Sequence, residues 1–260
     1  MRYCVCMKQV PDTQNIRIDP EKGTLIRKGI PVITNPFDES ALELAFEIRD
    51  RMGGEITVLT MGPPSSEEVA RDAISLGADR AFRLTDGIFA GSDTLATSYI
   101  LSMAIQKTGP YDVLLFGKQA IDGDTAQVGP EVAGFLGVPV ISFVTDVIEV
   151  SGDGILLERA TDEGREKVYC DYPLAITVVK AGKRLRMPTL KGVLRSLKAE
   201  VGLFTHEMID VEVDRCGLKG SPTRVKKVFS PEIRSKVRFI EGSVGEKARE
   251  AARIIKEIVG

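Results

Sequence analysis

The sequence predicts an α/β protein with an open, mostly parallel sheet, and two observations support this fold class. Short apolar runs alternate with longer stretches of helical periodicity between Arg2 and Leu136, an order typical of parallel strands joined by helices. The composition is that of an ordinary globular chain, because 43% of the 260 residues are hydrophobic and 28% are charged. We therefore expect a sheet that is covered by helices on both faces.

The first half of the chain supplies most of that sheet. The predicted strands are the apolar runs Arg2–Lys8, Glu55–Met61, Ala81–Leu84 and Asp112–Phe116. The predicted helices are the periodic stretches Asp38–Met52, Ser65–Leu76, Asp93–Lys107 and Asp124–Leu136. Gly53 and Gly77 directly follow the first two of these helices, and the Ser-Ser-Glu-Glu run at residues 65–68 is typical of a capped helix start.

After about residue 140 the pattern changes. The runs Val140–Val150, Gly154–Ala160, Glu166–Tyr172 and Leu174–Val179 predict a ribbon of strands that is appended to the sheet or completes it. Residues 180–198 hold seven basic and no acidic side chains, residues 200–243 are rich in turns, and Gly245–Val259 predicts an amphipathic helix. We expect one α/β domain over residues 1–180 and an extended C-terminal arm, ending in that helix, over residues 181–260.

Charge and residue usage exclude several classes of function. The formal net charge is −2, so the chain is not a bulk polyanion binder. Its four cysteines and the single histidine, His206, do not stand in a disulfide, metal-ligand or nucleophile spacing, so we expect no metal site and a structural His206. The longest uncharged run, Val132–Thr145, has 14 residues and is too short to span a bilayer. The N-terminus lacks the features of a secretory signal, which favours a cytoplasmic location.

Open parallel sheets bind ligands beyond the carboxyl ends of their strands, and four loops fall at that edge. These loops are Lys8–Thr13, Asn35–Asp38, Met61–Pro64 and Gly117–Pro130. In the last loop, Gly117 and Gly123 permit close backbone approach, and Asp124-Thr125 can begin a helix whose free N–H groups face a phosphate. Asp122 or Asp124 can accept hydrogen bonds from a ribose. The alternative is a capped turn after a strand, without a ligand. Neither GxGxxG nor GxxxxGK[ST] is present, so neither the standard dinucleotide fingerprint nor a P-loop applies.

Four motifs, in this order, resemble the beta subunit of electron transfer flavoproteins. They are Val-Cys-Met-Lys-Gln-Val-Pro at residues 5–11, Asn-Pro-Phe-Asp at 35–38, Gly-Lys-Gln-Ala-Ile-Asp-Gly-Asp-Thr at 117–125 and Arg-Met-Pro-Thr-Leu at 186–190. The resemblance covers almost the whole chain. It implies a Rossmann-like fold of the adenine-nucleotide-binding type and a heterodimer with an alpha subunit that carries the main redox FAD.

The resemblance also implies that this chain holds a second nucleotide. In the respiratory branch of the family that nucleotide is AMP, a structural ligand. In the electron-bifurcating branch it is a second FAD, which receives a hydride from NADH. The implied cofactor-binding residues are Cys6, Lys8, Asn35, Phe37, Asp38, Met61, Gly62, Gln119, Asp122, Gly123, Asp124, Thr125, Ala126, Gln127, Val128, Gly129, Pro130 and Ala133.

One stretch is more similar to the bifurcating branch. Respiratory members tend to carry Asp-x-Asn-Gln-Thr-Gly where this chain has Asp-Thr-Ala-Gln-Val-Gly at residues 124–129. Ala126 and Val128 offer fewer hydrogen bonds to a monophosphate and leave room for a pyrophosphate and a flavin. The resemblance then implies that electrons from NADH divide between ferredoxin or flavodoxin and the alpha-subunit FAD. That FAD feeds a partner dehydrogenase acting on an acyl-CoA, an enoyl-CoA or a hydroxy acid of the lactate type.

In this interpretation the flavin carries the chemistry, and we expect no general acid or base from the chain. The alternative is a respiratory-type subunit that binds AMP and acts only as a scaffold and docking subunit, or a nucleotide-binding module without a redox role.

The basic stretch around Leu190 resembles the loop through which the family docks on its partner dehydrogenase. Leu190 matches the leucine anchor of that loop, and Arg186, Lys191 and Arg195 surround it. Charges of this kind steer an encounter, while the leucine supplies burial. The alternative is a solvated charged face. Nucleic acid is disfavoured because no aromatic residue interleaves the charges. We expect the terminal helix to pack on the alpha subunit, with packing on its own domain as the alternative.

Overall fold

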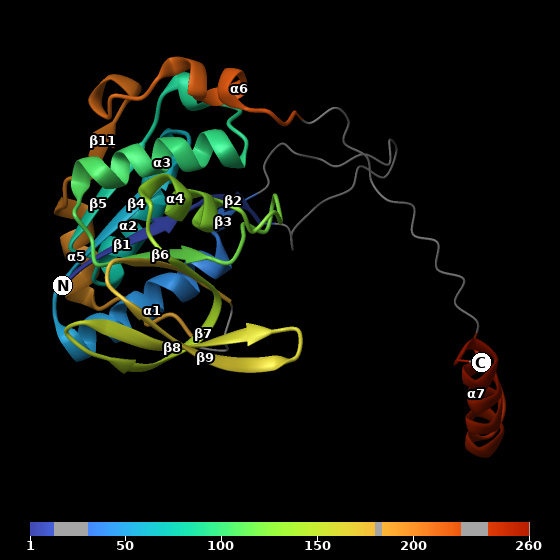
Figure 1. Cartoon of the computed structure of the whole chain (residues 1–260). Helices are drawn as coiled ribbons and strands as arrows, with labels where there is room; N and C mark the ends of the chain where they lie inside the picture. The colour runs from blue at the N-terminus through green and yellow to red at the C-terminus, as the bar shows by residue number, and fades with distance from the viewer. Residues whose placement is uncertain (13–30, 180–183, 225–238, 260) are drawn as a thin grey trace. The chain divides into compact units, whose positions relative to one another are not determined.

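A computed structural model describes residues 1–12, 31–179, 184–224 and 239–259 (Figure 1). The chain divides into two compact units, Met1–Arg224 and Val225–Gly260. The first unit holds the α/β sheet, and the second contributes one long helix.

One sheet forms the centre of the first unit, and within the described residues it has nine strands. Their order is β11–β5–β4–β1–β6–β10–β7–β8–β9. The bounds are β1 Arg2–Met7, β4 Glu55–Met61, β5 Arg80–Leu84, β6 Val113–Gly117, β7 Val140–Val150, β8 Gly154–Thr161, β9 Gly164–Asp171, β10 Leu174–Val178 and β11 Gly202–Phe204. Neighbours from β11 to β7 pair in parallel, and β7, β8 and β9 pair antiparallel. A separate antiparallel pair joins β2 (Gln9–Pro11) to β3 (Val32–Thr34).

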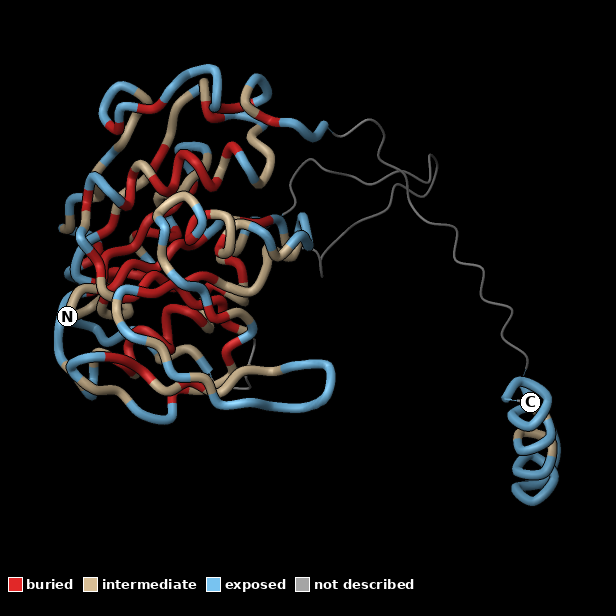
Figure 2. The backbone as a smooth tube through the Cα atoms, in the orientation of Figure 1, coloured by how far each residue is buried: buried red, intermediate tan, exposed pale blue. Residues whose placement is uncertain are grey.

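Helices cover both faces of the parallel part, as predicted. One layer consists of α1 (Pro36–Met52) and α2 (Glu67–Leu76), and the other of α3 (Thr94–Thr108) and α4 (Val128–Leu136). Alternate residues of β1 contact opposite layers, with Tyr3 and Val5 against α1 and α2, and Cys4 and Cys6 against α3 and α4. Figure 2 shows the buried backbone concentrated along these strands. The predicted fold class is confirmed.

The predicted ribbon completes the sheet rather than standing apart from it. β10 returns to lie between β6 and β7, so that β8 and β9 extend the sheet beyond β7. The register of β7 is irregular next to Phe143, whose φ of 65° lies in the left-handed region. A bulge of this kind bends a strand and redirects the side chain at the bend.

The first compact unit extends to Arg224 and so passes the predicted domain boundary at residue 180. Helix α5 (Leu190–Lys198) packs on α2, and β11 pairs with β5. The Phe204 ring stacks on the Phe82 ring of β5, with centroids 4.9 Å apart. A strand of three residues carries almost no periodicity, so its place in the sheet depends on this tertiary contact. Short helical turns complete the unit: η2 Pro64–Ser66, η3 Gly87–Phe89, η4 His206–Met208, η5 Val213–Arg215 and α6 Gly217–Gly220.

The second unit contains α7 (Val244–Val259), which confirms the predicted terminal helix. Glu246 caps the start of α7, because the Ser243 backbone N–H donates to Glu246 Oε2 at 2.8 Å and the Ser243 hydroxyl donates to the same oxygen at 2.7 Å. Ile255, Ile258 and Val259 are exposed on α7. No helix in the described ranges is both long enough and apolar enough to cross a bilayer.

Candidate functional site

The carboxyl ends of β1 and β6 are joined by the carboxylate of Asp38, on the first turn of α1. The Lys8 backbone N–H donates to Asp38 Oδ2 at 2.7 Å, and the Gly117 backbone N–H donates to Oδ1 at 3.1 Å. A Cβ on Gly117 would lie only 2.7 Å from the Asp38 nitrogen, so only glycine allows this approach. The crossovers diverge here, since the chain runs from β1 toward β4 and from β6 toward β7. Asp38 therefore fixes the topological switch point where such sheets bind ligands.

Asp38 is buried, with 6% of its surface exposed. Burial raises the pKa of the Asp38 carboxyl to about 7, against the opposing effect of hydrogen bonds from the Lys8 backbone, the Asn35 side chain and the Gly117 backbone. The carboxyl therefore titrates near neutral pH while it holds two strand ends together.

Asn35 ties the loop after β6 to the start of α1. Its Nδ2 donates to the Gln119 carbonyl oxygen at 2.8 Å, and its Oδ1 accepts from the Ile121 backbone N–H at 3.3 Å. Asn35 is almost fully buried, so both amide groups are used inside the protein. The structure thus places Asn35 and Asp38, two predicted cofactor-binding residues, beneath the loops that they shape.

The loop from Gly117 to Gln127 runs over the outside of this edge. Lys8 Nζ lies 2.7 and 2.8 Å from the two carboxylate oxygens of Asp122, and the Gln119 side chain contacts Asp124. Residues 122–125 and Gln127 are exposed. Asp124 and Ala126 have φ values of 57° and 55°, so the backbone turns sharply twice within three residues. The loop presents backbone and small side chains to solvent.

The helix expected from Asp124 begins at Val128 instead. The left-handed residues Asp124 and Ala126 are incompatible with a continuous helix, while Pro130 is tolerated in the first turn because that turn's N–H groups need no intrahelical partner. A Cβ on Gly129 would lie 2.7 Å from Thr177 Cγ2, so this glycine lets α4 approach β10. Ala133 is buried in the same layer. Gly129 and Ala133 therefore position the helix, whose N-terminus follows the exposed loop.

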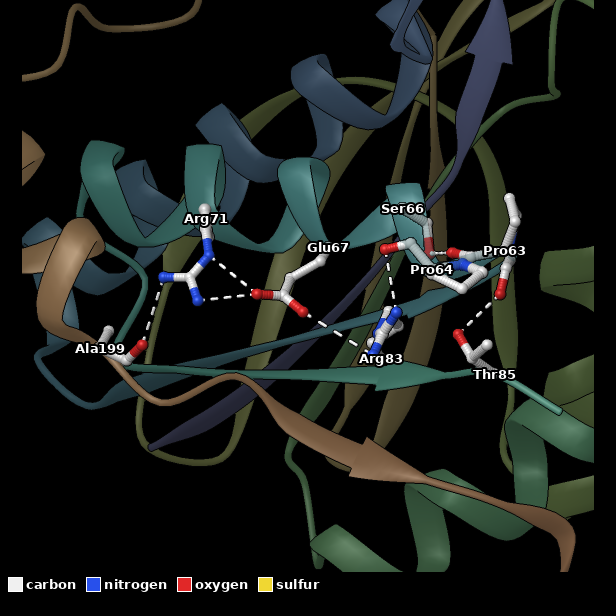
Figure 3. Close-up of polar contacts among 9 residues, drawn as sticks. Pro63, Pro64, Ser66, Glu67, Arg71, Arg83, Thr85 and Ala199 are labelled. Atoms are coloured by element: carbon white, nitrogen blue, oxygen red, sulfur yellow. Dashed lines mark hydrogen bonds and ion pairs between the residues drawn. The ribbon is translucent and has the colours of Figure 1, made fainter.

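The loop after β4 forms another part of the edge, and Figure 3 shows the contacts that hold it. The Thr85 hydroxyl donates to the Gly62 carbonyl oxygen at 2.7 Å, and the Ser66 hydroxyl donates to the Pro63 carbonyl oxygen at 2.8 Å. Arg83 donates to the Pro64 carbonyl oxygen at 2.9 Å. Met61 and Gly62, both predicted to bind the cofactor, are half-buried at the base of this loop.

Two further predicted residues flank the switch point. Cys6 is buried on β1, where a hydrogen bond with the Cys4 thiol, together with burial, raises the pKa of Cys6 well above its ordinary value. The thiol is therefore protonated and contributes to packing rather than to nucleophilic chemistry. Phe37 is half-buried on the first turn of α1.

Phe143 is a neighbour of the site that the sequence did not indicate. Its ring is 39% exposed, and Lys118 Nζ lies 5.5 Å from the ring centroid. The Phe143 backbone N–H donates to the Thr177 hydroxyl at 3.1 Å, which holds the left-handed backbone in place. A positive φ is rare for a bulky residue, so no sequence pattern predicts this backbone conformation at Phe143.

Helix α5 carries the predicted docking residue Leu190 and packs with its apolar side outward. Leu190, Leu194 and Leu197 are 78%, 52% and 71% exposed, and Val193 between them is also exposed. The inward side has small and polar residues: Ser196 is buried, and a Cβ on Gly192 would overlap the Ser75 carbonyl oxygen of α2. The spacing i, i+3, i+4, i+7 places all four apolar side chains on one face. The predicted docking residue Leu190 therefore belongs to an exposed apolar stripe on a helix rather than to a loop.

The basic residues near this stripe divide into two groups. Arg186 pairs with Glu43 at 2.9 Å and with Asp50 at 3.0 Å, and its guanidinium lies over the Phe46 ring. Arg195 donates to the Ala78 carbonyl oxygen. Both side chains thus contact their own chain, whereas Lys191 is exposed beside the stripe.

His206, the only histidine in the sequence, has a structural environment. Its Nδ1 lies 2.6 Å from Asp86 Oδ2, which also accepts the His206 backbone N–H at 3.1 Å. Burial opposes the ionisation of Asp86, but the hydrogen bonds from His206 and from the Ile88 backbone outweigh it and lower the pKa of Asp86 to about 2. This pair fixes the turn that follows β11. Among the described residues no three His, Cys, Asp or Glu side chains converge as a metal site.

The strand order defines a doubly wound α/β protein, and the loops after β1, β4 and β6 form the edge at which such folds bind ligands. The family model described as "Electron transfer flavoprotein domain" matches residues 22–202. The chain belongs to the electron transfer flavoprotein family and corresponds to its beta subunit.

Curated relatives align along nearly the full chain. "Protein FixA" of Bradyrhizobium diazoefficiens is 44% identical over 266 residues, covering 100% of this chain and 91% of the relative. The "Electron transfer flavoprotein subunit beta" of Clostridium acetobutylicum is 43% identical, covering 99% of this chain and 98% of the relative. The "Caffeyl-CoA reductase-Etf complex subunit CarD" of Acetobacterium woodii is 40% identical, covering 99% of this chain and 98% of the relative.

Proposed function

We propose that this chain is the FAD-binding beta subunit of an electron-bifurcating electron transfer flavoprotein. Its partners are an alpha subunit with its own FAD, ferredoxin or flavodoxin, and a dehydrogenase of the acyl-CoA, enoyl-CoA or lactate type. When bound here, FAD supplies the ring that accepts a hydride from NADH and releases electrons singly, one to the low-potential carrier and one to the alpha-subunit FAD.

The open form of the loop after β6 carries this proposal. A Cβ on Gly123 would meet nothing within 4 Å, and the residues on either side of Gly123 are exposed. Ala126, at a sharp turn, offers only a methyl group. A surface of small residues and backbone accommodates a ligand that continues past its first phosphate, as a dinucleotide does. The similarity to a subunit named for a caffeyl-CoA reductase–Etf complex supports a partner that acts on an enoyl-CoA.

The predicted cofactor-binding residues then divide into two roles. The exposed and half-buried ones contact the nucleotide: Lys8, Phe37, Met61, Gly62, Gln119, Asp122, Gly123, Asp124, Thr125, Ala126, Gln127, Val128 and Pro130. The buried ones, among them Asn35, Asp38, Gly129 and Ala133, shape the loops. Lys8 supplies positive charge, and the N-terminus of α4, which begins at Val128, favours an anionic phosphate through its helix dipole.

The partner surfaces follow from the two amphipathic helices. The apolar stripe of α5 (Leu190, Val193, Leu194 and Leu197) suits an apolar groove on a dehydrogenase, and the exposed Lys191 favours an acidic rim around that groove. α7 has no buried residue, and its apolar side chains suit a groove on the alpha subunit.

Nucleotide content tests the proposal directly. The heterodimer is purified, its nucleotides are released with acid, and FAD and AMP are counted per heterodimer by chromatography. Two FAD and no AMP are expected, together with NADH-driven reduction of ferredoxin or flavodoxin. One FAD and one AMP would instead assign the chain to the respiratory type, with a structural nucleotide.

A substitution at Ala126 sharpens this test. Asparagine tolerates the left-handed backbone at this position better than alanine does, so Ala126→Asn is expected to fold normally. Its side chain adds bulk and hydrogen-bonding groups beside the loop, so the variant should retain less FAD and more AMP than the wild type. Ala90→Asn, at an exposed position with ordinary backbone, is the matched control. Equal FAD content in all three proteins would contradict the role given to this loop.

A further inference from the structure

At the C-terminal end of α5, the guanidinium group of Arg71 in α2 contacts backbone carbonyl groups (Figure 3). Arg71 NH1 donates to the carbonyl oxygen of Ser196 at 2.7 Å and to that of Ala199 at 3.3 Å. Carbonyl groups in the last turn of a helix have no intrahelical partner, and a cation placed there also interacts favourably with the helix dipole. Arg71 therefore caps α5 from a neighbouring helix.

The orientation of the Arg71 guanidinium is set by Glu67. Arg71 Nε and NH2 donate to Glu67 Oε1 at 2.9 and 2.7 Å. The second oxygen, Glu67 Oε2, lies 3.7 Å from Arg83 NH2, and Arg83 in turn donates to the Pro64 carbonyl oxygen in the loop after β4. With both sides of its carboxylate engaged, Glu67 holds the planar fork of Arg71 in one direction.

Helix α5 needs such support because burial contributes little to its attachment. Its leucines are exposed, so it is held by the close approach of Gly192 to α2, by the buried Ser196 and by arginine–carbonyl hydrogen bonds. Arg71 of α2 makes two of these bonds, and Arg195 makes one to Ala78, just beyond α2. A helix held by so few groups changes its orientation when one of them is lost. The direction of the exposed stripe would change with it.

We propose that Arg71 is a positioning residue for partner docking: held by Glu67, it caps α5 and sets the direction in which the apolar stripe faces the partner. This inference rests on the proposed docking role of α5. It assigns to Arg71 an effect on partner affinity although the side chain lies behind the docking surface. If Arg71 only stabilised α2 through its ion pair with Glu67, its loss would not change the affinity for the partner.

The first test needs no partner. Hydrogen–deuterium exchange is measured on the heterodimer for the wild type, for Arg71→Met, which retains an apolar stem, and for Arg165→Met, a matched loss of an exposed arginine that pairs with Glu158 at 2.8 Å. The backbone amides of α5 should exchange about tenfold faster in Arg71→Met, while those of the sheet do not change. Arg165→Met should match the wild type. Unchanged exchange of α5 in Arg71→Met would overturn the proposal.

The second test measures docking. The heterodimer is titrated onto an immobilised acyl-CoA dehydrogenase, an enoyl-CoA reductase and a flavin-containing lactate dehydrogenase, and the tightest binder of the wild type serves as the probe. Arg71→Met should weaken binding about tenfold with unchanged nucleotide content, and Arg71→Lys should lie between it and the wild type. Combined with Leu194→Ala, Arg71→Met should lose less than the product of the two single effects, because both act through the same surface.

The outcomes separate the two claims. Lost binding in Leu194→Ala with full binding in Arg71→Met would overturn the positioning role and leave the docking surface in place. Full binding in Leu194→Ala, or no binding of any probe by the wild type, would contradict the docking surface, and the exchange rates of α5 would then decide whether Arg71 holds the helix.

Discussion

Asp38 should make the stability of the protein depend on pH between about pH 4 and pH 7. Its pKa is raised by burial from 3.8 in the unfolded chain to about 7 in the folded protein. A group that binds its proton more tightly in the folded state stabilises that state below the lower pKa and loses this contribution as the pH rises through the higher one. Stability due to Asp38 should therefore fall with rising pH, opposite to the behaviour of a salt-bridged carboxylate.

The magnitude follows from the pKa difference. About three pKa units at roughly 1.4 kcal/mol each give a loss of about 4 kcal/mol in the free energy of unfolding across this window. Solvent screening does not reduce this free energy appreciably, because only 6% of Asp38 is exposed. Asp38→Asn does not titrate, but its Nδ2 would face the backbone N–H of either Lys8 or Gly117. That mismatch costs about 1–3 kcal/mol at every pH.

Urea unfolding of wild type and Asp38→Asn at half-unit steps from pH 4.5 to pH 8 isolates the effect. The wild type should be the more stable protein at pH 4.5, and its advantage should shrink by about 3–4 kcal/mol as the pH reaches 8. Asp162→Asn, in the exposed hairpin between β8 and β9, is the control for the loss of one charge. A difference between wild type and Asp38→Asn that stays constant within about 1 kcal/mol would refute the assignment of a raised pKa to this carboxyl.

Three further predictions follow from the same contacts. Gly117→Ala should lower the free energy of unfolding by about 2–4 kcal/mol, because its Cβ would collide with the first turn of α1. Gly123→Ala should leave the free energy of unfolding nearly unchanged, and thermal melts of the two variants check both expectations. His206→Gln should shift acid unfolding to higher pH. The hydrogen bonds from His206 help to lower the pKa of Asp86 to about 2, and the stability that Asp86 contributes is lost as the pH falls through that value. The same unfolding midpoint for both proteins, in an acid titration followed by circular dichroism, would contradict the pairing. Leu197→Glu should leave the melting temperature within about 2 °C of the wild type, because the side chain is 71% exposed. The same variant should bind the dehydrogenase at least tenfold more weakly. Calorimetric titration measures the affinity, and unchanged affinity would count against α5 as the docking surface.

The fold was predictable wherever a pattern is repeated over several turns or strands. Residues 3–7 and 113–116 are apolar at every position, which is typical of strands buried on both faces, and both strands form as expected. The terminal helix was evident from apolar residues such as Ile255 at spacings of three and four.

The features that escaped prediction depend on tertiary contacts. β11 has three residues and joins the sheet through the Phe82–Phe204 stack. No local sequence pattern predicts that contact. The periodicity of residues 190–198 does not reveal that the polar side of α5 faces inward, because that depends on the close approach of Gly192 to α2. At the candidate site, the motif residues lie together at one edge, but their spacing did not indicate that Asp38 would bind two strand ends.

The outward apolar face of α5 has a consequence for how the protein can change over evolutionary time. The inward positions of this helix, such as Gly192 and Ser196, contact the rest of the fold, while the docking surface proposed above consists of outward positions such as Leu190 and Leu197. Substitutions at the outward positions therefore carry almost no folding penalty. A duplicated copy of the gene could acquire a new dehydrogenase by exchanging a few exposed side chains, while its nucleotide site and its α/β sheet stay as they are.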